Sequence, residues 1–222
     1  MCAYTRYTPE ICVAACGRDW SLRRPAALEE LWDSLDEEEF GEDERLPYWV
    51  ELWPASLALA ELLFEEREYI CGKRCLDLGC GLGLTAMVGT WLGAWVMAVD
   101  YEPEALLFAR RNADANTIPQ PLWTAMDWRR PALARGSIEC VWGGDIMYER
   151  RFVSPVLAFL GHVLARGGKA WMAEPGRDVY DHFRAALVAG GWQSRLVRTV
   201  TVDPLYVQPV GVGVKLWELT KD

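Results

Sequence analysis

The sequence is poor in histidine and has no surplus of positive charge. Its only histidines are His162 and His182, and its 23 basic residues stand against 32 acidic ones. Binding to nucleic-acid phosphates needs clustered lysine and arginine, so a net charge of −9 argues against a general nucleic-acid-binding protein. Both histidines fall inside predicted helices, and no serine, histidine and aspartate set lies at the predicted strand ends. Hydrolase chemistry is therefore poorly supported.

The cysteines form neither a disulfide framework nor a zinc motif. Seven cysteines are an odd set in a chain that is large enough to need no disulfides. Cys71, Cys75 and Cys80 are close in sequence, but spacings of four and five residues fit no common zinc site. The N-terminus also lacks the charged and apolar segments of a secretory signal. We therefore expect a cytoplasmic protein with reduced cysteines and no metal.

Residues 78–99 carry no charged side chain, over a length that could cross a bilayer. Five glycines interrupt this stretch, and Asp77 and Asp100 bound it. This pattern is typical of a buried strand, a glycine turn, a helix and a second buried strand. We therefore expect no membrane contact.

The first 45 residues differ in composition from the rest, and we interpret them as an acidic N-terminal extension to a domain at 46–222. Ten of the sixteen residues 29–44 are acidic and none is basic. Leu28, Leu31, Trp32 and Leu35 nevertheless keep helical spacing. Two interpretations stay open: a solvated amphipathic helix, or a docking surface for a basic partner.

From residue 47 onward, short apolar strands alternate with amphipathic helices, which predicts a parallel sheet covered on both faces. The sequence predicts helices at 55–68, 84–92, 103–113, 153–164 and 179–188, and strands at 74–78, 95–100, 122–125, 138–142 and 169–173. Residues 193–202 and 210–219 are rich in β-forming residues and read as an antiparallel hairpin. The predicted fold is α/β, with a doubly wound, mostly parallel sheet that ends in this C-terminal hairpin.

The most informative stretch follows the strand at 74–78. Gly79, Gly81 and Gly83 alternate along a turn, where glycine lets the backbone bend sharply and approach a ligand. A third glycine of a dinucleotide fingerprint would stand at position 84, which is leucine, and this argues against NAD. Asp100 ends the next strand and can accept hydrogen bonds from two ribose hydroxyls. It can also cap the following helix, and the two roles can coexist.

These glycines, together with Asp77 and Asp100, resemble the nucleotide-binding half of class I S-adenosylmethionine-dependent methyltransferases. The resemblance covers residues 48–219 and implies a seven-stranded Rossmann-like sheet with S-adenosylmethionine as cofactor. It also implies that Asp77 lies near the amino end of the cofactor's methionine and that Asp100 holds the ribose.

Three further motifs narrow the resemblance. They are PYWVELWP at 47–54, DIMY at 145–148 and EPGR at 174–177. Together they resemble the seven-strand protein lysine methyltransferases, in particular the electron-transfer flavoprotein beta-subunit lysine methyltransferase group and its bacterial relatives. The resemblance implies protein lysine N-methylation and a protein partner that presents a lysine.

Two aromatic positions are candidate cofactor contacts. The face of Trp53 could attract the cofactor's sulfonium, worth roughly 0.5 to 2 kcal/mol, or the ring could pack in the core. Asp127 and Trp128 follow the third strand, where methyltransferases commonly meet adenine. The alternative for this pair is an ordinary surface turn with a partly buried tryptophan.

The candidate catalytic residues are Asp145 and Tyr148, after the fourth strand. A lysine amine must lose its proton before it attacks, which costs about 4 kcal/mol at neutral pH. A carboxylate and a phenol could orient the amine and receive that proton. The alternative for Asp145 is a helix cap. Arg177 could clamp an acidic group of the substrate or brace Glu174 in the neighbouring turn, and we expect the brace.

Two other functions remain open for the same scaffold. One is N-methylation of a small molecule, because a fold does not fix its substrate. The other is a cofactor-binding interaction module without turnover. We expect a monomer, because no long apolar stripe stays exposed once the sheet is covered.

Overall fold

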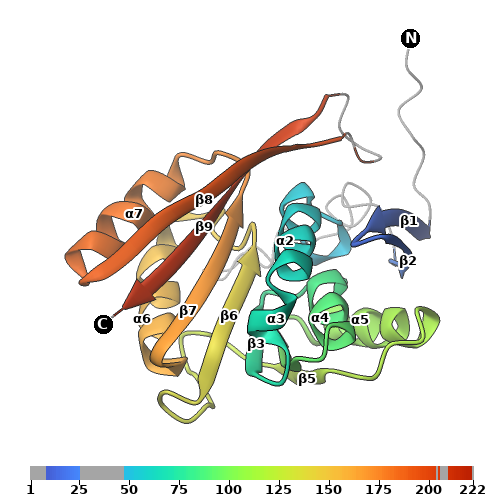
Figure 1. Cartoon of the computed structure of the whole chain (residues 1–222), viewed down its shortest axis with the longest axis horizontal. Helices are drawn as coiled ribbons and strands as arrows, with labels where there is room; N and C mark the ends of the chain where they lie inside the picture. The colour runs from blue at the N-terminus through green and yellow to red at the C-terminus, as the bar shows by residue number, and fades with distance from the viewer. Residues whose placement is uncertain (1–8, 26–47, 204, 206–209, 222) are drawn as a thin grey trace, which may run out of the picture.

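The computed structural model describes residues 9–25, 48–203, 205 and 210–221. A seven-stranded, mostly parallel sheet carries helices on both faces (Figure 1). The predicted doubly wound α/β fold is therefore confirmed. The amphipathic pattern at 28–35 and the acidic run at 29–44 lie outside the described residues.

The central sheet has the strand order β5-β4-β3-β6-β7-β9-β8. Its parallel strands are β3 (Arg74–Leu78), β4 (Trp95–Asp100), β5 (Leu122–Ala125), β6 (Ile138–Gly144) and β7 (Leu164–Glu174). The antiparallel strands β8 (Trp192–Val202) and β9 (Val212–Lys221) form the predicted C-terminal hairpin, and β9 pairs with β7. After β5 the chain returns to the other side of β3. Ligands of such sheets bind at this reversal, outside the carboxyl ends of β3 and β6.

The helices divide between the two faces of the sheet, as Figure 1 shows. One face carries α2 (Pro54–Glu65), α4 (Leu84–Trp91) and α5 (Pro103–Ala115), and the other carries α6 (Val153–Val163) and α7 (Val179–Ala189). The helix that the sequence predicts at 55–68 is two helices, since α2 ends at Glu65 and the short α3 spans Arg67–Ile70. Gly191 follows α7 with φ +73°, a left-handed conformation that glycine adopts readily after a helix.

Each face of the sheet has its own apolar core, because successive side chains of a strand point in opposite directions. On β6, Cys140 and Trp142 face α2 and α4, whereas Val141 faces α6 and α7. The same alternation on β7 places Trp171 in the first core and Met172 in the second. Burial on both faces explains why the parallel strands read as continuous apolar runs.

A second, two-stranded sheet lies at the N-terminal end of the described chain. Strands β1 (Glu10–Ala15) and β2 (Arg18–Arg23) pair antiparallel, and β2 contacts α5. Cys16 and Gly17 form the turn with φ values of +58° and +74°. The sequence analysis did not predict this hairpin, although Trp20 and Leu22 alternate with polar residues and are both fully buried. The domain boundary near residue 46 stays a prediction.

The uncharged stretch at 78–99 divides among the end of β3, a turn, α4 and β4, as expected. No helix in the described part of the chain is both long and apolar enough to cross a membrane.

Candidate functional site

The glycine turn between β3 and α4 is held in a conformation that suits glycine. Gly79, Gly81 and Gly83 have φ values of +70°, +49° and +87°. A Cβ on Gly79 would lie 2.7 Å from Cγ2 of Ile146, and one on Gly83 would lie 2.8 Å from Cβ of Ala109. The turn therefore packs closely against neighbouring elements, and its backbone forms part of a cavity wall.

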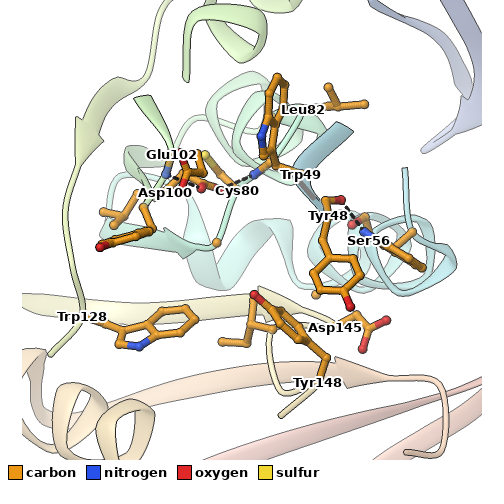
Figure 2. A pocket seen from close by; sticks show the side chains of 18 of the residues that line it. Tyr48, Trp49, Ser56, Cys80, Leu82, Asp100, Glu102, Trp128, Asp145 and Tyr148 are labelled. Carbon is orange, nitrogen blue, oxygen red and sulfur yellow. Dashed lines mark hydrogen bonds between the residues drawn. The ribbon is translucent and has the colours of Figure 1, made fainter. Parts of the chain in front are cut away.

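Asp100 lies beside this turn at the end of β4, and its carboxylate is nearly buried at 9% exposure. The Gly81 N–H donates to Oδ2 at 2.8 Å, and the Glu102 N–H donates to Oδ1 at 3.0 Å (Figure 2). Burial raises the pKa of this carboxyl to about 6. Each oxygen keeps lone-pair capacity for a further donor, such as a hydroxyl group. Asp100 therefore both braces the turn that leads into α5 and faces the cavity.

Asp77 lies beneath the turn and is not among the residues that line the cavity. Its carboxylate is 1% exposed, and the Thr85 hydroxyl donates to Oδ2 at 2.6 Å. Burial raises its pKa to about 7. In this structure Asp77 ties the end of β3 to the first turn of α4, and direct contact with a cofactor stays a prediction.

The segment before α2 forms one lip of the cavity. Its first residues, Tyr48–Val50, make a 3₁₀ turn, and Trp53 Nε1 donates to the Tyr48 carbonyl at 2.9 Å. Trp49 packs against Phe108 of α5, with ring centroids 5.7 Å apart. Trp53 lines the cavity, and its ring centroid lies 5.9 Å from the guanidinium carbon of Arg177. Its contact with a cofactor stays a prediction.

Asp127 and Trp128 line the cavity after β5. Asp127 accepts hydrogen bonds from the backbone N–H of Arg129 at 2.8 Å and from its guanidinium at 2.9 and 3.0 Å. The Trp128 ring meets Phe152 edge-on, with centroids 5.4 Å apart. Both predicted residues are therefore at the site, but Asp127 is already engaged with its neighbour Arg129.

Asp145 follows β6 with a left-handed backbone, φ +52°, and its N–H donates to the Ala173 carbonyl at 2.8 Å. Asp145 Oδ1 and Oδ2 accept hydrogen bonds from Arg177 Nε and Nη2, both at 2.7 Å. Burial raises the pKa of Asp145, and the Arg177 guanidinium opposes that rise. The expected partnership of Arg177 with Glu174 is wrong. Glu174 accepts the Gly176 N–H instead, which leaves the guanidinium free to reach Asp145.

Tyr148 belongs to a row of aromatic rings along the cavity. Its ring lies 4.9 Å from Tyr48 and 5.0 Å from Phe152, centroid to centroid, and Tyr48 lies 6.1 Å from Trp53. Figure 2 shows Tyr48 and Tyr148 beside Asp145, with Trp128 farther along the same wall. Burial raises the pKa of Tyr148 well above the usual range of a phenol. The phenol therefore keeps its proton at neutral pH.

The structure thus brings nearly all the predicted residues to one cavity at the sheet reversal. They are Trp53, Gly79, Gly81, Gly83, Asp100, Asp127, Trp128, Asp145 and Tyr148, with Asp77 behind the wall. The sequence analysis missed Phe152 and Glu51, which also line this cavity. Glu51 stands inside the PYWVELWP motif, but Phe152 carries no sequence signal apart from its proximity to Tyr148.

Comparison with known proteins finds similarity to methyltransferases. Residues 57–135 match the family model of ribosomal protein L11 methyltransferase (PrmA). The electron transfer flavoprotein beta subunit lysine methyltransferase of Xenopus laevis is 31% identical over 59% of this chain and 53% of its own length. The histone-arginine methyltransferase METTL23 of Mus musculus is 24% identical over 55% of this chain and 50% of its own. The chain therefore spans about half the length of these relatives.

A solved structure supports the same fold. A 16S rRNA methyltransferase of T. thermophilus, solved with AdoMet and guanosine, superposes with a TM-score of 0.60. It is 17% identical and covers 96% of this chain, which itself covers 50% of that chain. At this identity the likeness shows the shared fold alone.

The cavity itself fits S-adenosylmethionine. The nearly buried Asp100 keeps acceptor capacity for hydroxyl groups, and aromatic faces line the wall where a sulfonium would lie. Gly81, with φ +49°, has no side chain, so its backbone atoms themselves line that wall. The family-model match, the relatives and the shared fold together support a class I S-adenosylmethionine-dependent methyltransferase.

Proposed function

We propose that this chain transfers a methyl group from S-adenosylmethionine to an amine nitrogen, and that the acceptor is a lysine side chain of a protein. One observation carries the proposal: the carboxylates of Asp100 and Asp145 open into the same cavity, on either side of the glycine turn. The first is suited to hold a ribose, and the second is suited to receive an amine. A cofactor and an acceptor could therefore meet in this space.

On the cofactor side, the chain supplies acceptors and flat apolar surfaces. Asp100 would accept the ribose hydroxyls, and the bare backbone at Gly81 would lie against the ligand. Asp127 and Trp128 would hold the adenine, the first by accepting from its amine and the second by packing on its ring. When bound, S-adenosylmethionine supplies an electrophilic methyl carbon on a sulfonium.

On the acceptor side, Asp145 would hold the amine and take up its proton. Each of its oxygens accepts one hydrogen bond from Arg177, and lone-pair capacity remains for the N–H groups of an amine. Burial raises the pKa of Asp145, which makes it a better proton acceptor than an exposed aspartate. Tyr148, which stays protonated, would position the amine by hydrogen bonding and would not act as a base.

The aromatic row favours a cationic acceptor that must lose its charge at the site. Ring faces attract an ammonium group as it enters, by roughly 0.5 to 2 kcal/mol for each well-placed ring. The same rings exclude water, and desolvation lowers the pKa of a lysine amine. Tyr48, Tyr148 and Phe152 stand where both effects would act, next to Asp145. This supports a lysine over a neutral acceptor.

The relatives also support a protein acceptor, because one is named for a lysine and the other for a histone arginine. The acidic residues 29–44 would suit a basic protein surface as partner. Electrostatic steering of that kind weakens with salt, since the Debye length falls from about 30 Å at 0.01 M to about 10 Å at 0.1 M.

Incubation with methyl-labelled S-adenosylmethionine and a lysate of the host tests the proposal. We expect label on a lysine, identified by mass spectrometry of the modified peptide. Asp145→Ala should abolish labelling and change the cofactor Kd by less than about 3-fold, because Asp145 lies on the acceptor side. Asp181→Ala, which removes an exposed aspartate of α7, is the matched control and should label normally.

Three outcomes would contradict the proposal in different ways. Label on an arginine or on a small molecule would overturn the acceptor and leave methyl transfer intact. Cofactor binding without any labelled acceptor would overturn catalysis and favour an interaction module. Full activity of Asp145→Ala would move the acceptor site away from β6.

A further inference from the structure

The outer edge of β2 is paired with side chains of α5 in place of a third strand. Asn112 Oδ1 accepts the Arg23 N–H at 2.7 Å, and its Nδ2 donates to the Arg23 carbonyl at 3.2 Å. Asn116, one helical turn later, does the same for Ser21, at 2.9 and 2.7 Å. The backbone N–H and C=O groups of Ser21 and Arg23 point away from β1. The two asparagine amides therefore satisfy the hydrogen bonds of a strand edge that has no neighbouring strand.

Only one of these two asparagines also contacts the glycine turn that lines the cavity. The second N–H of the Asn112 amide donates to the Leu82 carbonyl at 3.0 Å. Leu82 lies between Gly81 and Gly83 in the turn that lines the cavity. Asn112 is fully buried, and it joins the N-terminal hairpin to the glycine turn through a single side chain.

A second connection runs from the end of the hairpin to the cavity lip. Arg24 Nη1 donates to Glu51 Oε1, and the two side chains are 2% and 8% exposed. The Arg24 N–H also donates to the Pro9 carbonyl at 3.0 Å, which holds this arginine against the start of the hairpin. Glu51 lines the cavity, so the hairpin contacts both the turn and the lip.

The contact with Asn112 restrains the glycine turn. Three glycines within five residues give the turn unusual conformational freedom when it is not supported. Asp100 supports it from the β4 side through the Gly81 N–H, and Asn112 supports it from the α5 side through the Leu82 carbonyl. A turn fixed on both sides loses less entropy when it binds a ligand, and this improves affinity.

We propose that the N-terminal hairpin is a clamp that preforms the cofactor site, with Asn112 and Arg24 as its positioning residues. Neither residue lines the cavity. Both act through another group, Asn112 through the Leu82 carbonyl and Arg24 through the Glu51 carboxylate. The proposal rests on binding of S-adenosylmethionine at this cavity and does not depend on the identity of the methyl acceptor.

The pair Asn112→Ser and Asn116→Ser separates positioning from general stability. Each variant removes two hydrogen bonds to β2, so both should lower the Tm by a similar amount. Only Asn112→Ser also releases Leu82. We expect it to raise the Kd for S-adenosylmethionine about 10-fold in calorimetry, and we expect less than a 2-fold change for Asn116→Ser.

Hydrogen exchange in the protein without cofactor provides a second measurement. The Gly83 N–H donates to the Cys80 carbonyl at 2.8 Å within the turn, and its protection reports whether the turn is formed. We expect that protection to fall in Asn112→Ser and to hold in Asn116→Ser. Equal changes in Kd and in protection for the two variants, or no change in either, would overturn the proposal.

The charge pair gives an independent test that stands even if Asn112→Ser does not fold. We expect Arg24→Met to raise the Kd about 5-fold, because the lip loses its anchor at Glu51. Arg24→Lys keeps the charge and should stay within 2-fold of the wild-type value. An unchanged Kd for Arg24→Met would overturn the role of the clamp at the lip. Absence of cofactor binding by the wild-type chain would overturn the cofactor site itself.

Discussion

Arg177 holds both carboxylate oxygens of Asp145 with two parallel hydrogen bonds of 2.7 Å. The Asp145 side chain is 3% exposed and the Arg177 side chain 37%, so the guanidinium covers the carboxylate on its solvent side. The turn that carries Arg177 is itself fixed by the buried Glu174, which accepts the Gly176 N–H and, at 3.3 Å, the Trp217 indole N–H. Glu174 therefore shapes the turn that carries Arg177, and Arg177 in turn orients the Asp145 carboxylate.

Arg177→Gln tests this orientation through the pH dependence of methyl transfer. The guanidinium lowers the pKa of Asp145, so its removal should raise that pKa further. If ionised Asp145 takes the acceptor's proton, the low-pH limb of kcat should move to higher pH, and kcat on that limb should fall. Rates with the labelled lysate between pH 5.5 and 9 measure the shift.

The control for this variant is Arg184→Gln, whose arginine pairs with the exposed Asp181 on α7. It should leave both kcat and its pH profile unchanged. The cofactor Kd should stay within 2-fold of wild type in both variants, because neither arginine lines the cavity. A profile for Arg177→Gln that coincides with the wild-type profile would show that Asp145 is not the proton acceptor.

Asp100→Ala should weaken cofactor binding sharply. Hydrogen bonds to charged groups contribute about 1.5 to 3 kcal/mol, which corresponds to a rise in Kd of about 10- to 150-fold. Asp127→Ala is the comparison, because Asp127 already pairs with Arg129 and is more exposed. Its loss should cost less than about 10-fold. Isothermal titration calorimetry measures both values, and an unchanged Kd for Asp100→Ala would rule out the ribose contact.

The strands and helices could be predicted from the sequence because their signals are local. Strands β3, β4 and β5 have the predicted bounds, since each is an apolar run that ends at a turn or an acidic residue. Bends were harder to predict. The break between α2 and α3 at Glu66 has neither a glycine nor a proline to mark it, so the sequence reads as one helix.

The sequence also predicts which residues come together at the site, but it does not predict which side chains hydrogen-bond to one another there. The carboxyl ends of parallel strands meet at one edge, and this rule places Asp100 and Asp145 together without any coordinates. Whether Arg177 hydrogen-bonds to Glu174 or to Asp145 depends on the conformation of the turn after β7, in which Gly176 has φ +89°. The N-terminal hairpin was missed because its order depends on long-range contacts with Asn112 and Asn116, not on its own short strands.

Asp77→Asn should stabilise the protein in alkaline solution and lose that advantage in acid. Burial raises the folded-state pKa of Asp77 from its ordinary value of 3.8 to about 7. A raised acid pKa contributes stability that is fully present below pH of about 4 and is lost as the pH rises through 7. The neutral asparagine avoids that loss, and its side-chain oxygen can still accept the Thr85 hydroxyl.

We therefore expect the Tm of Asp77→Asn to exceed that of wild type at pH 8 by at least about 2 °C, the shift that 1 kcal/mol produces in a chain of this size. The difference should become smaller at pH 5 and approach zero only below about pH 4, where Asp77 is protonated in both the folded and the unfolded protein. Asp100 titrates in both proteins, and its charge adds to the rise in the pKa of Asp77 in the wild type. Thermal unfolding without cofactor measures the difference in Tm, and Asp181→Asn, which changes an exposed aspartate, is the control. A difference that stays constant between pH 5 and pH 8 would mean that Asp77 does not titrate in this range.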